Sequence, residues 1–100
     1  MAESDELPEL NEIFSAPQRM AIMFLLYFHR RVKFKDMQRL LNITPGNLDH
    51  HVRKLKKTGC VKTPYLLSWR PLVVIEITDR GTEAFRDYAI KLRKQLEKIK

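Results

Sequence analysis

The sequence predicts a mostly helical α+β domain, and three observations support that prediction. Apolar residues recur at helical spacing up to Gly59, and again from Phe85 to Ile99. Between these parts lies a segment rich in β-branched residues and bounded by prolines, which is typical of a β-hairpin. The chain has 100 residues, so we expect a single domain over residues 1–100 with one hydrophobic core.

The N-terminal part predicts a central core helix over residues 16–30, because this segment is apolar on most sides. Ser15 and Gln18 have the spacing of a capping box, and Pro17 suits a first helical turn. We expect residues 1–6 to be disordered and a short helix to follow them. The apolar residues of that short helix are Leu7, Leu10, Ile13 and Phe14.

Two shorter helices joined by a tight connection are expected next. After an extended link at residues 32–34, the first of them has the apolar positions Phe34, Met37, Leu40 and Leu41. In the second, over residues 44–58, Thr44 can cap the first N–H groups and Pro45 fits the first helical position. Gly59 can end it in a left-handed conformation. Its aliphatic residues form one narrow stripe, namely Leu48, Val52 and Leu55.

After this helix the pattern changes to that of a two-stranded hairpin. Residues 60–63 and 72–77 are rich in β-branched side chains and predict the two strands. We expect Pro64 and Pro71 to confine the strand pairing to the parts outside them, because proline cannot donate a ladder hydrogen bond.

A long helix is expected over residues 79–99, and its apolar stripe predicts a dimerisation helix because the steps are heptad-like. The stripe consists of Phe85, Tyr88, Leu92, Leu96 and Ile99. Two short helices with a tight turn, then a hairpin and a long helix, specify a winged helix-turn-helix. The expected fold is therefore mostly α, with a two-stranded wing and a long C-terminal helix.

Charge is distributed unevenly along the chain. The first 14 residues hold five acids and no Lys or Arg, so all 19 basic residues follow them. Such an excess of basic residues favours a polyanionic partner, either nucleic acid or an anionic membrane. The alternative is a protein that is basic without having such a partner. No apolar run is long enough to span a membrane, and nothing resembles a signal peptide. We expect a cytoplasmic protein.

The polar face of the helix over residues 44–58 is the candidate nucleic-acid surface. Asn47 can form a bidentate pair with adenine and Arg53 with guanine. Lysines on the same face would contact phosphates and so set the salt dependence of binding. The alternatives are that Asn47 is a capping or turn residue, and that the bases only form a solvated face. Those bases are Arg53, Lys54, Lys56 and Lys57.

The sequence contains no catalytic set and no Gly-rich phosphate loop, so we expect neither enzymatic activity nor a cofactor. His50 and His51 are adjacent and diverge on a helix, so they cannot form the i,i+4 pair of a helical zinc site. We expect His50 to be exposed, and His51 to border the core and bond a backbone group. Cys60 is expected to be a small buried hydrophobic residue.

The segment from Leu41 to Val61 is similar to the recognition-helix signature of small prokaryotic winged-helix regulators, in the broad MarR/ArsR-like group. The residues that match this signature are Leu41, Ile43, Thr44, Gly46, Asn47, Leu48, His51, Val52, Leu55, Gly59, Cys60 and Val61. Ile77-Thr78-Asp79-Arg80-Gly81 resembles the motif that closes the wing and opens the last helix. The order and spacing of the two motifs extend the resemblance over residues 16–90.

The resemblance implies a sequence-specific transcriptional regulator that binds double-stranded DNA, usually as a homodimer. It implies that one set of residues faces the major groove or its phosphates, namely Thr44, Pro45, Gly46, Asn47, His50 and Arg53. Lys54 and Lys57 would lie toward the DNA backbone. Arg70, at the hairpin tip, would reach an adjacent groove.

The hairpin tip departs from the family pattern. Wings of the family commonly hold several Arg, Lys or Gly residues, whereas this tip has Trp69-Arg70-Pro71 after three apolar residues. This departure favours a second hypothesis, in which the chain is a protein-interaction module of a larger assembly and the Trp69 hairpin is its contact surface. The alternative for Trp69 is packing against the first helix. No metal-sensing set of Cys, His and acidic residues is present, so we expect no metal site.

Overall fold

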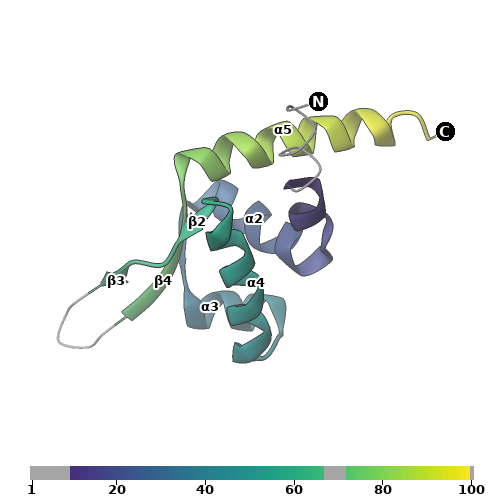
Figure 1. Cartoon of the computed structure of the whole chain (residues 1–100). Coiled ribbons are helices and arrows are strands. Elements are labelled where there is room, and N and C mark those ends of the chain that lie inside the picture. Colours follow the sequence, from purple (N-terminus) through teal and green to yellow (C-terminus); the bar gives the residue numbers. More distant parts are fainter. Residues whose placement is uncertain (1–9, 67–71, 100) are drawn as a thin grey trace.

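The computed structural model of the chain describes residues 10–66 and 72–99 (Figure 1). Residues 10–15 are helical and lead into the labelled elements. These are α2 (Pro17–His29), β1 (Arg31–Lys33), α3 (Phe34–Leu41), α4 (Pro45–Lys57), β2 (Val61–Lys62), β3 (Tyr65–Leu66), β4 (Leu72–Ile77) and α5 (Asp79–Leu96). This order confirms the predicted winged helix-turn-helix, with α3 and α4 as the helix pair and the strands β2 to β4 as the wing.

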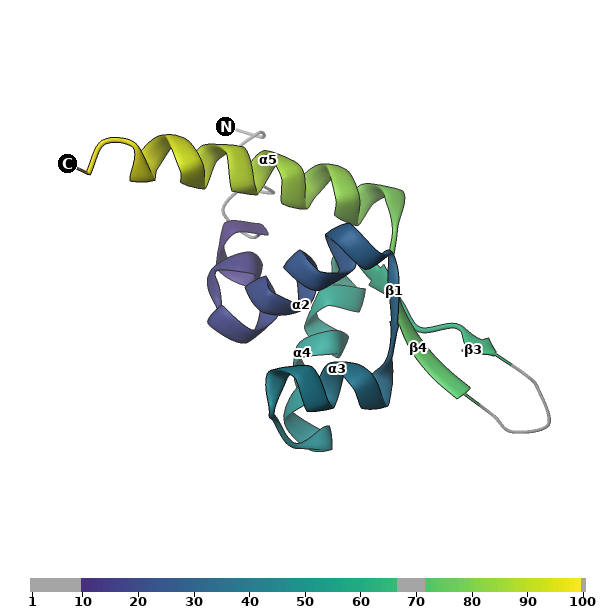
Figure 2. The same ribbon diagram turned by 180° about the vertical axis from the view of Figure 1, so that it is seen from behind.

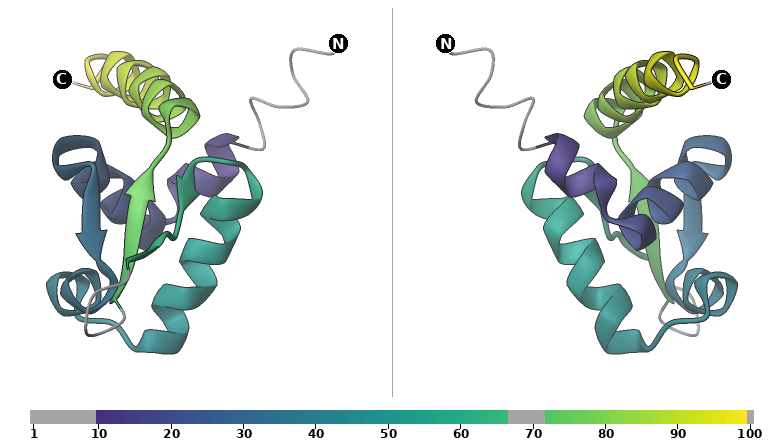
Figure 3. Two further views of the ribbon diagram at one scale, coloured as in Figure 1. Left: turned by 90° about the vertical axis from the view of Figure 1, so that its left-hand side faces the viewer. Right: turned by 90° about the vertical axis from the view of Figure 1, so that its right-hand side faces the viewer.

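Helix α2 occupies the middle of the molecule. Figures 1 and 2 show α5 lying across one end of the body, with α3 and α4 at the opposite end and the wing projecting sideways. Figure 3 shows that α4 runs from the end of the molecule remote from α5 toward the wing. The first turn of α4 is therefore at the far end of the molecule, where no other long element covers it.

The core contains side chains from every helix and from the sheet. Residues Ile22, Met23 and Leu26 of α2 are fully buried, which confirms α2 as the central core helix. The remaining members of the core are Phe14, Met37, Leu48, Val52, Leu55, Cys60, Val61, Ile75, Ile77 and Phe85. Burial of this apolar surface is the main force that holds α4 and the wing in fixed positions.

Two threonine caps fix the helices on either side of the wing. Thr44 is the N-cap of α4, where its Oγ1 accepts a hydrogen bond from the N–H of Asn47 at 3.1 Å. Thr78 caps α5 in the same way, and its Oγ1 accepts from the N–H of Gly81 at 2.9 Å. Gly59 follows α4 with a φ of 79°, as predicted. The start and the end of α4 are thus set by local sequence.

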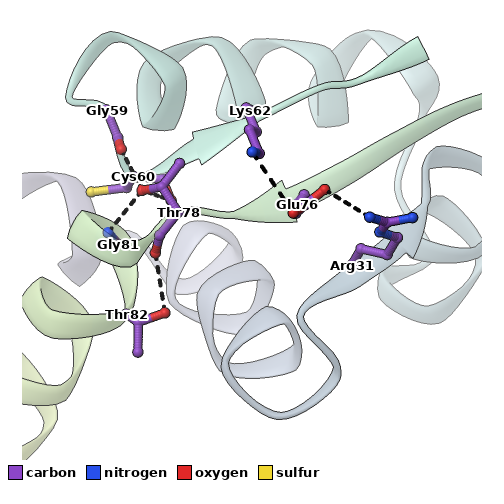
Figure 4. Close-up of polar contacts among 8 residues, drawn as sticks. All are labelled: Arg31, Gly59, Cys60, Lys62, Glu76, Thr78, Gly81 and Thr82. Atoms are coloured by element: carbon purple, nitrogen blue, oxygen red, sulfur yellow. Dashed lines mark hydrogen bonds and ion pairs between the residues drawn. The ribbon is translucent and has the colours of Figure 1, made fainter. Parts of the chain in front are cut away.

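The start of α5 packs directly on the start of the wing (Figure 4). The hydroxyl of Thr78 donates to the carbonyl oxygen of Gly59 at 2.6 Å, and the N–H of Thr78 donates to the carbonyl oxygen of Cys60 at 3.0 Å. A Cβ atom added to Gly81 would lie 2.1 Å from that carbonyl oxygen of Cys60. Only glycine permits this approach of two backbone segments.

Residues 31–33 form a strand, and not only the extended link that the sequence predicted. Strand β1 pairs with β4 in antiparallel register, with Arg31 opposite Glu76, and the sheet has the order β1-β4-β2. The carboxylate of Glu76 lies 3.3 Å from Arg31 and 3.9 Å from Lys62 on the two flanking strands (Figure 4). The strand was missed because its pairing partner is far away in the sequence.

Strand pairing continues past Pro64, which corrects the prediction that the prolines would confine it. The carbonyl oxygen of Pro64 accepts a hydrogen bond from the N–H of Val74 at 3.4 Å, and β3 then pairs with β4. Proline lacks a donor but keeps its acceptor, and an outer strand needs hydrogen bonds on one side only. Pro71 lies outside the described residues.

The predicted capping box at the start of α2 is absent. Ala16 is the N-cap, and no side chain caps it. The hydroxyl of Ser15 donates instead to the carbonyl oxygen of Glu12 at 3.1 Å. The reason is that residues 10–15 are themselves helical, so Ser15 ends one helix and does not begin the next.

Candidate nucleic-acid interface

Helix α4 is attached to the body along one edge. Leu48, Val52 and Leu55 are all buried, as the sequence predicted, and they pack toward α2. These residues recur at i, i+4 and i+7 and therefore define one stripe along the helix. The rest of the helix surface remains available to a partner.

A pair of side-chain contacts adds to this attachment. His51 of α4 contacts two residues of α2. Its Nδ1 lies 3.0 Å from Nη1 of Arg19, and its Nε2 lies 2.7 Å from Oε1 of Gln18. Burial, and then the positive charges of Arg19, His50 and Lys54, lower the pKa of His51. The sequence predicted a backbone partner for His51, which is wrong because both nitrogens of its ring contact side chains in the first turn of α2.

The structure gathers eight of the nine residues predicted to bind DNA on one helix, and all eight are exposed. They are Thr44, Pro45, Gly46, Asn47, His50, Arg53, Lys54 and Lys57. The spacing of 47, 50, 54 and 57 follows the turns of α4, so these side chains share one side of it. Arg70, the ninth, lies outside the described residues, and so does Trp69.

The side chain of Asn47, in the first turn of α4, has no hydrogen-bond partner among the described residues and can make an external contact. The capping hydroxyl of Thr44 accepts a hydrogen bond from the backbone N–H of Asn47, so the cap does not involve the side-chain amide of Asn47. A Cβ atom added to Gly46 would meet nothing within 4 Å, so packing inside this chain does not require a glycine there. Helix propensity does not explain it either, because glycine is a poor helix former.

Two polar contacts order the exposed side chains of α4. Nε of Arg53 lies 2.8 Å from Oδ2 of Asp49, one turn earlier on the same helix. Nearer the wing, Nζ of Lys56 donates to Oγ1 of Thr63 at 2.9 Å. Sequence reasoning did not assign a role to Asp49, although its i,i+4 spacing from Arg53 was a readable signal.

The apolar stripe of α5 divides into an internal part and an exposed part. Phe85 is buried and Tyr88 is half-buried, and both rings contact the ring of Phe14, with centroid distances of 5.5 and 5.4 Å. Leu96 is the last residue of α5 and is 54% exposed; Ile99, which is 73% exposed, lies beyond the end of the helix, although the sequence predicted a helix to residue 99. The part of the stripe that can reach a partner therefore begins near Leu92.

An apolar groove of about 550 Å³ lies between α2 and α5. Phe24 and Phe28, which are 57% and 65% exposed, line it from α2, and Leu92 and Leu96 line it from α5. The exposure of these two phenylalanines was not predicted from the sequence. The available signal was that α2 is apolar on more sides than a single core can cover.

Cys60 is buried, as predicted, and burial raises the pKa of its thiol. Its sulfur accepts a hydrogen bond from the hydroxyl of Thr58 at 3.3 Å. Within residues 10–66 and 72–99, no three His, Cys, Asp or Glu side chains are grouped closely enough to hold a metal ion. Over the same residues, no helix is sufficiently long and apolar to span a membrane.

Comparison with known families and sequences relates the chain to winged-helix proteins. A family model described as a winged helix DNA-binding domain matches residues 18–96. An uncharacterized protein from Methanocaldococcus jannaschii is 36% identical, and the alignment covers 86% of this chain and 98% of that protein.

Solved structures of similar proteins share the fold. A transcriptional regulator homologue from Pyrococcus horikoshii OT3 is 36% identical with a TM-score of 0.87, covering 99% of this chain and 98% of that one. A putative transcriptional regulator of the MarR family from Enterococcus faecalis V583 has a TM-score of 0.79 at 21% identity, covering 95% and 86% of the two chains. The second likeness concerns the fold alone.

Proposed function

The chain belongs to the family of winged helix DNA-binding domains, and from that premise we propose that it is a sequence-specific, homodimeric transcriptional regulator. Its partner is double-stranded DNA, which α4 reads in the major groove. The protein acts where the DNA of a prokaryotic cell lies, in the cytoplasm.

One observation supports the role of α4 above all others. The helix buries a single stripe of three aliphatic residues, while every residue of its remaining basic side stays exposed. A major groove admits one α-helix, and a helix held along one edge can enter it. The first turn of α4 also lies at the end of the molecule remote from α5 (Figure 3), and its residues Pro45, Gly46 and Asn47 are exposed.

The exposed residues of α4 divide into two roles. Asn47 and Arg53 read base edges, because an amide can pair with adenine and a guanidinium with guanine through two hydrogen bonds each. His50, Lys54 and Lys57 contact phosphates, which set the affinity and its dependence on salt. The cap already binds the N–H of Asn47, so the N–H of Gly46 is the first-turn donor left for a phosphate, which the positive end of the helix dipole attracts. Gly46 has no side chain, so the backbone can approach that phosphate closely.

The homodimer forms through α5 and the groove beside it. Leu96 at the end of α5, Ile99 beyond it, and Phe24 and Phe28 on α2 are large apolar side chains that stay exposed, and a group of such side chains on a surface marks an interaction site. A dimer that reads two half-sites needs its two α4 helices about 34 Å apart, which is one turn of DNA. The dimer would then read a two-fold-related site.

The alternative, a protein-interaction module that uses the Trp69 hairpin, has no support from the described residues, because Trp69 is outside them. We therefore retain the regulator as the single proposed function.

Alanine substitutions test the proposal. Asn47→Ala and Arg53→Ala should each weaken binding to the preferred site by more than they weaken binding to random duplex DNA, because base contacts carry the sequence information. Lys94→Ala, which removes an exposed base from α5 and not from α4, is the matched control and should leave the preference unchanged. If both α4 variants keep the wild-type preference, these residues do not read the site.

A further inference from the structure

Asp49 is the one acidic residue in α4, whose other charged side chains are the bases Arg53, Lys54, Lys56 and Lys57. It lies on the exposed part of the helix that we assign to DNA binding. A carboxylate there repels phosphates and lowers nonspecific affinity. We therefore look for a role of Asp49 that outweighs the loss of nonspecific DNA affinity.

The geometry of the Asp49–Arg53 pair indicates that role. The contact at 2.8 Å joins Oδ2 of Asp49 to Nε of Arg53. A guanidinium has five N–H donors in a rigid plane, and only one of them is on Nε. No other partner of the Arg53 guanidinium lies among the described residues, so the edge formed by its two Nη groups remains free.

A free Nη edge matches the edge of guanine. Guanine presents two acceptors, O6 and N7, side by side in the major groove, and an arginine can bind both at once. An arginine whose Nε is already held has lost part of its rotational freedom before it meets the base. Less conformational entropy is then lost when the two hydrogen bonds form.

The carboxylate of Asp49 also makes a contact of Arg53 with a base edge more favourable than its contact with a phosphate. Arg53 can keep its contact with Asp49 while it binds a neutral base edge. If the guanidinium moves to a phosphate, either the contact breaks or the carboxylate comes close to a second negative charge. The pair therefore favours base contact over phosphate contact.

We propose that Asp49 is a specificity-determining residue that positions Arg53 for a guanine and disfavours its contact with phosphates. This inference rests on the proposed function, since it requires that α4 reads a DNA site.

The chain contains a matched control for this pair. On α3, Asp36 and Arg39 form an i,i+3 ion pair at 3.4 Å with similar exposure of both side chains. Asp49→Asn and Asp36→Asn change the net charge equally, and each removes one exposed ion pair. Both variants should stay folded, because exposed ion pairs contribute little to stability, and circular dichroism will check this.

The test measures binding of each protein to the site selected by the wild type and to random duplex DNA over a salt series. For Asp49→Asn we expect tighter nonspecific binding and a ratio of specific to nonspecific affinity that falls about tenfold, because the bidentate contact is no longer favoured. Asp36→Asn should leave that ratio unchanged. If Asp49→Asn keeps the wild-type ratio, or Asp36→Asn lowers it equally, the inference is overturned.

A double substitution separates positioning from simple charge. When Arg53 is already alanine, Asp49→Asn should not change the ratio further, because Asp49 acts through Arg53. An additional fall in that background would overturn the positioning role. A wild-type protein that selects no site would overturn the proposed function together with this inference, whereas a selective wild type with an unaffected Asp49→Asn variant would overturn the inference alone.

Discussion

Nη1 of Arg19 on α2 lies 3.0 Å from Nδ1 of His51 on α4, and this contact determines the protonation state of the imidazole. Arginine can only donate hydrogen bonds, so Nδ1 must be the unprotonated acceptor. The proton then resides on Nε2, which donates to Oε1 of Gln18 at 2.7 Å. The contact between α2 and α4 thus requires a neutral His51.

This requirement predicts that the protein loses stability in mildly acidic solution. The pKa of His51 is lowered in the folded state, by burial first and by the charge of Arg19 second. As the pH falls below about 6.5, the unfolded chain binds a proton at this residue while the folded chain resists it. The free energy of unfolding should therefore decrease with falling pH until the folded state is also protonated.

Urea melts from pH 7.5 downward measure this loss, and His51→Gln should remove the part that His51 causes. His29→Gln, a substitution at the exposed end of α2, is the control and should keep the wild-type pH dependence. The same slope in the His51→Gln variant would show that another group is responsible.

Gly46→Ala should have opposite effects on folding and on DNA binding. An added methyl group meets nothing within 4 Å, so alanine should stabilise the helix, by up to about 1 kcal/mol. The same methyl group would stand between the first turn and a phosphate and should weaken DNA binding severalfold. Thermal melts and DNA titrations measure the two effects, and unchanged DNA affinity would exclude close contact at Gly46.

Gly81→Ala should strongly destabilise the fold. Its Cβ atom would lie 2.1 Å from the carbonyl oxygen of Cys60, and neither backbone segment can move without disturbing the junction of α5 with the wing. We expect a loss of about 2–3 kcal/mol or more in the free energy of unfolding. Gly46→Ala is the matched comparison, and a loss below about 1 kcal/mol would mean that this junction adapts.

Leu96→Asp should dissociate the proposed dimer without unfolding the protomer. Leu96 is more than half exposed in the single chain, so a charge there costs little unless a partner covers it. Leu40→Asp changes a similarly exposed leucine on α3, away from the groove, and should leave the assembly intact. Size-exclusion chromatography with light scattering distinguishes the two, and a surviving Leu96→Asp dimer would place the interface elsewhere.

The sequence predicted those parts of the fold that local chemistry determines. The cap at Thr44, the positive φ of Gly59 and the stripe of Leu48, Val52 and Leu55 each depend on residues within one helix. The long strand over residues 72–77 was also predicted with its bounds, since six consecutive residues suit a pleated strand. These elements alone specify which side of α4 is buried and which side is exposed.

The remaining features depend on contacts between distant segments. Strand β1 forms because β4 lies beside it, and three residues contain no signal of that pairing. The partners of His51 are Gln18 and Arg19 of α2, which become its neighbours only after the helices pack. The exposure of Phe24 and Phe28 likewise depends on where α5 lies, so the sequence showed an apolar helix without showing its uncovered side.

The most direct test of the account is selection of binding sites from a random duplex library by the wild-type protein, with the affinity of the selected site measured across a salt series. We predict an enriched two-fold-related site whose half-sites lie about 10 base pairs apart, and binding that weakens steeply with salt. Binding without an enriched sequence, or no binding at low salt, would contradict the claim that α4 reads DNA.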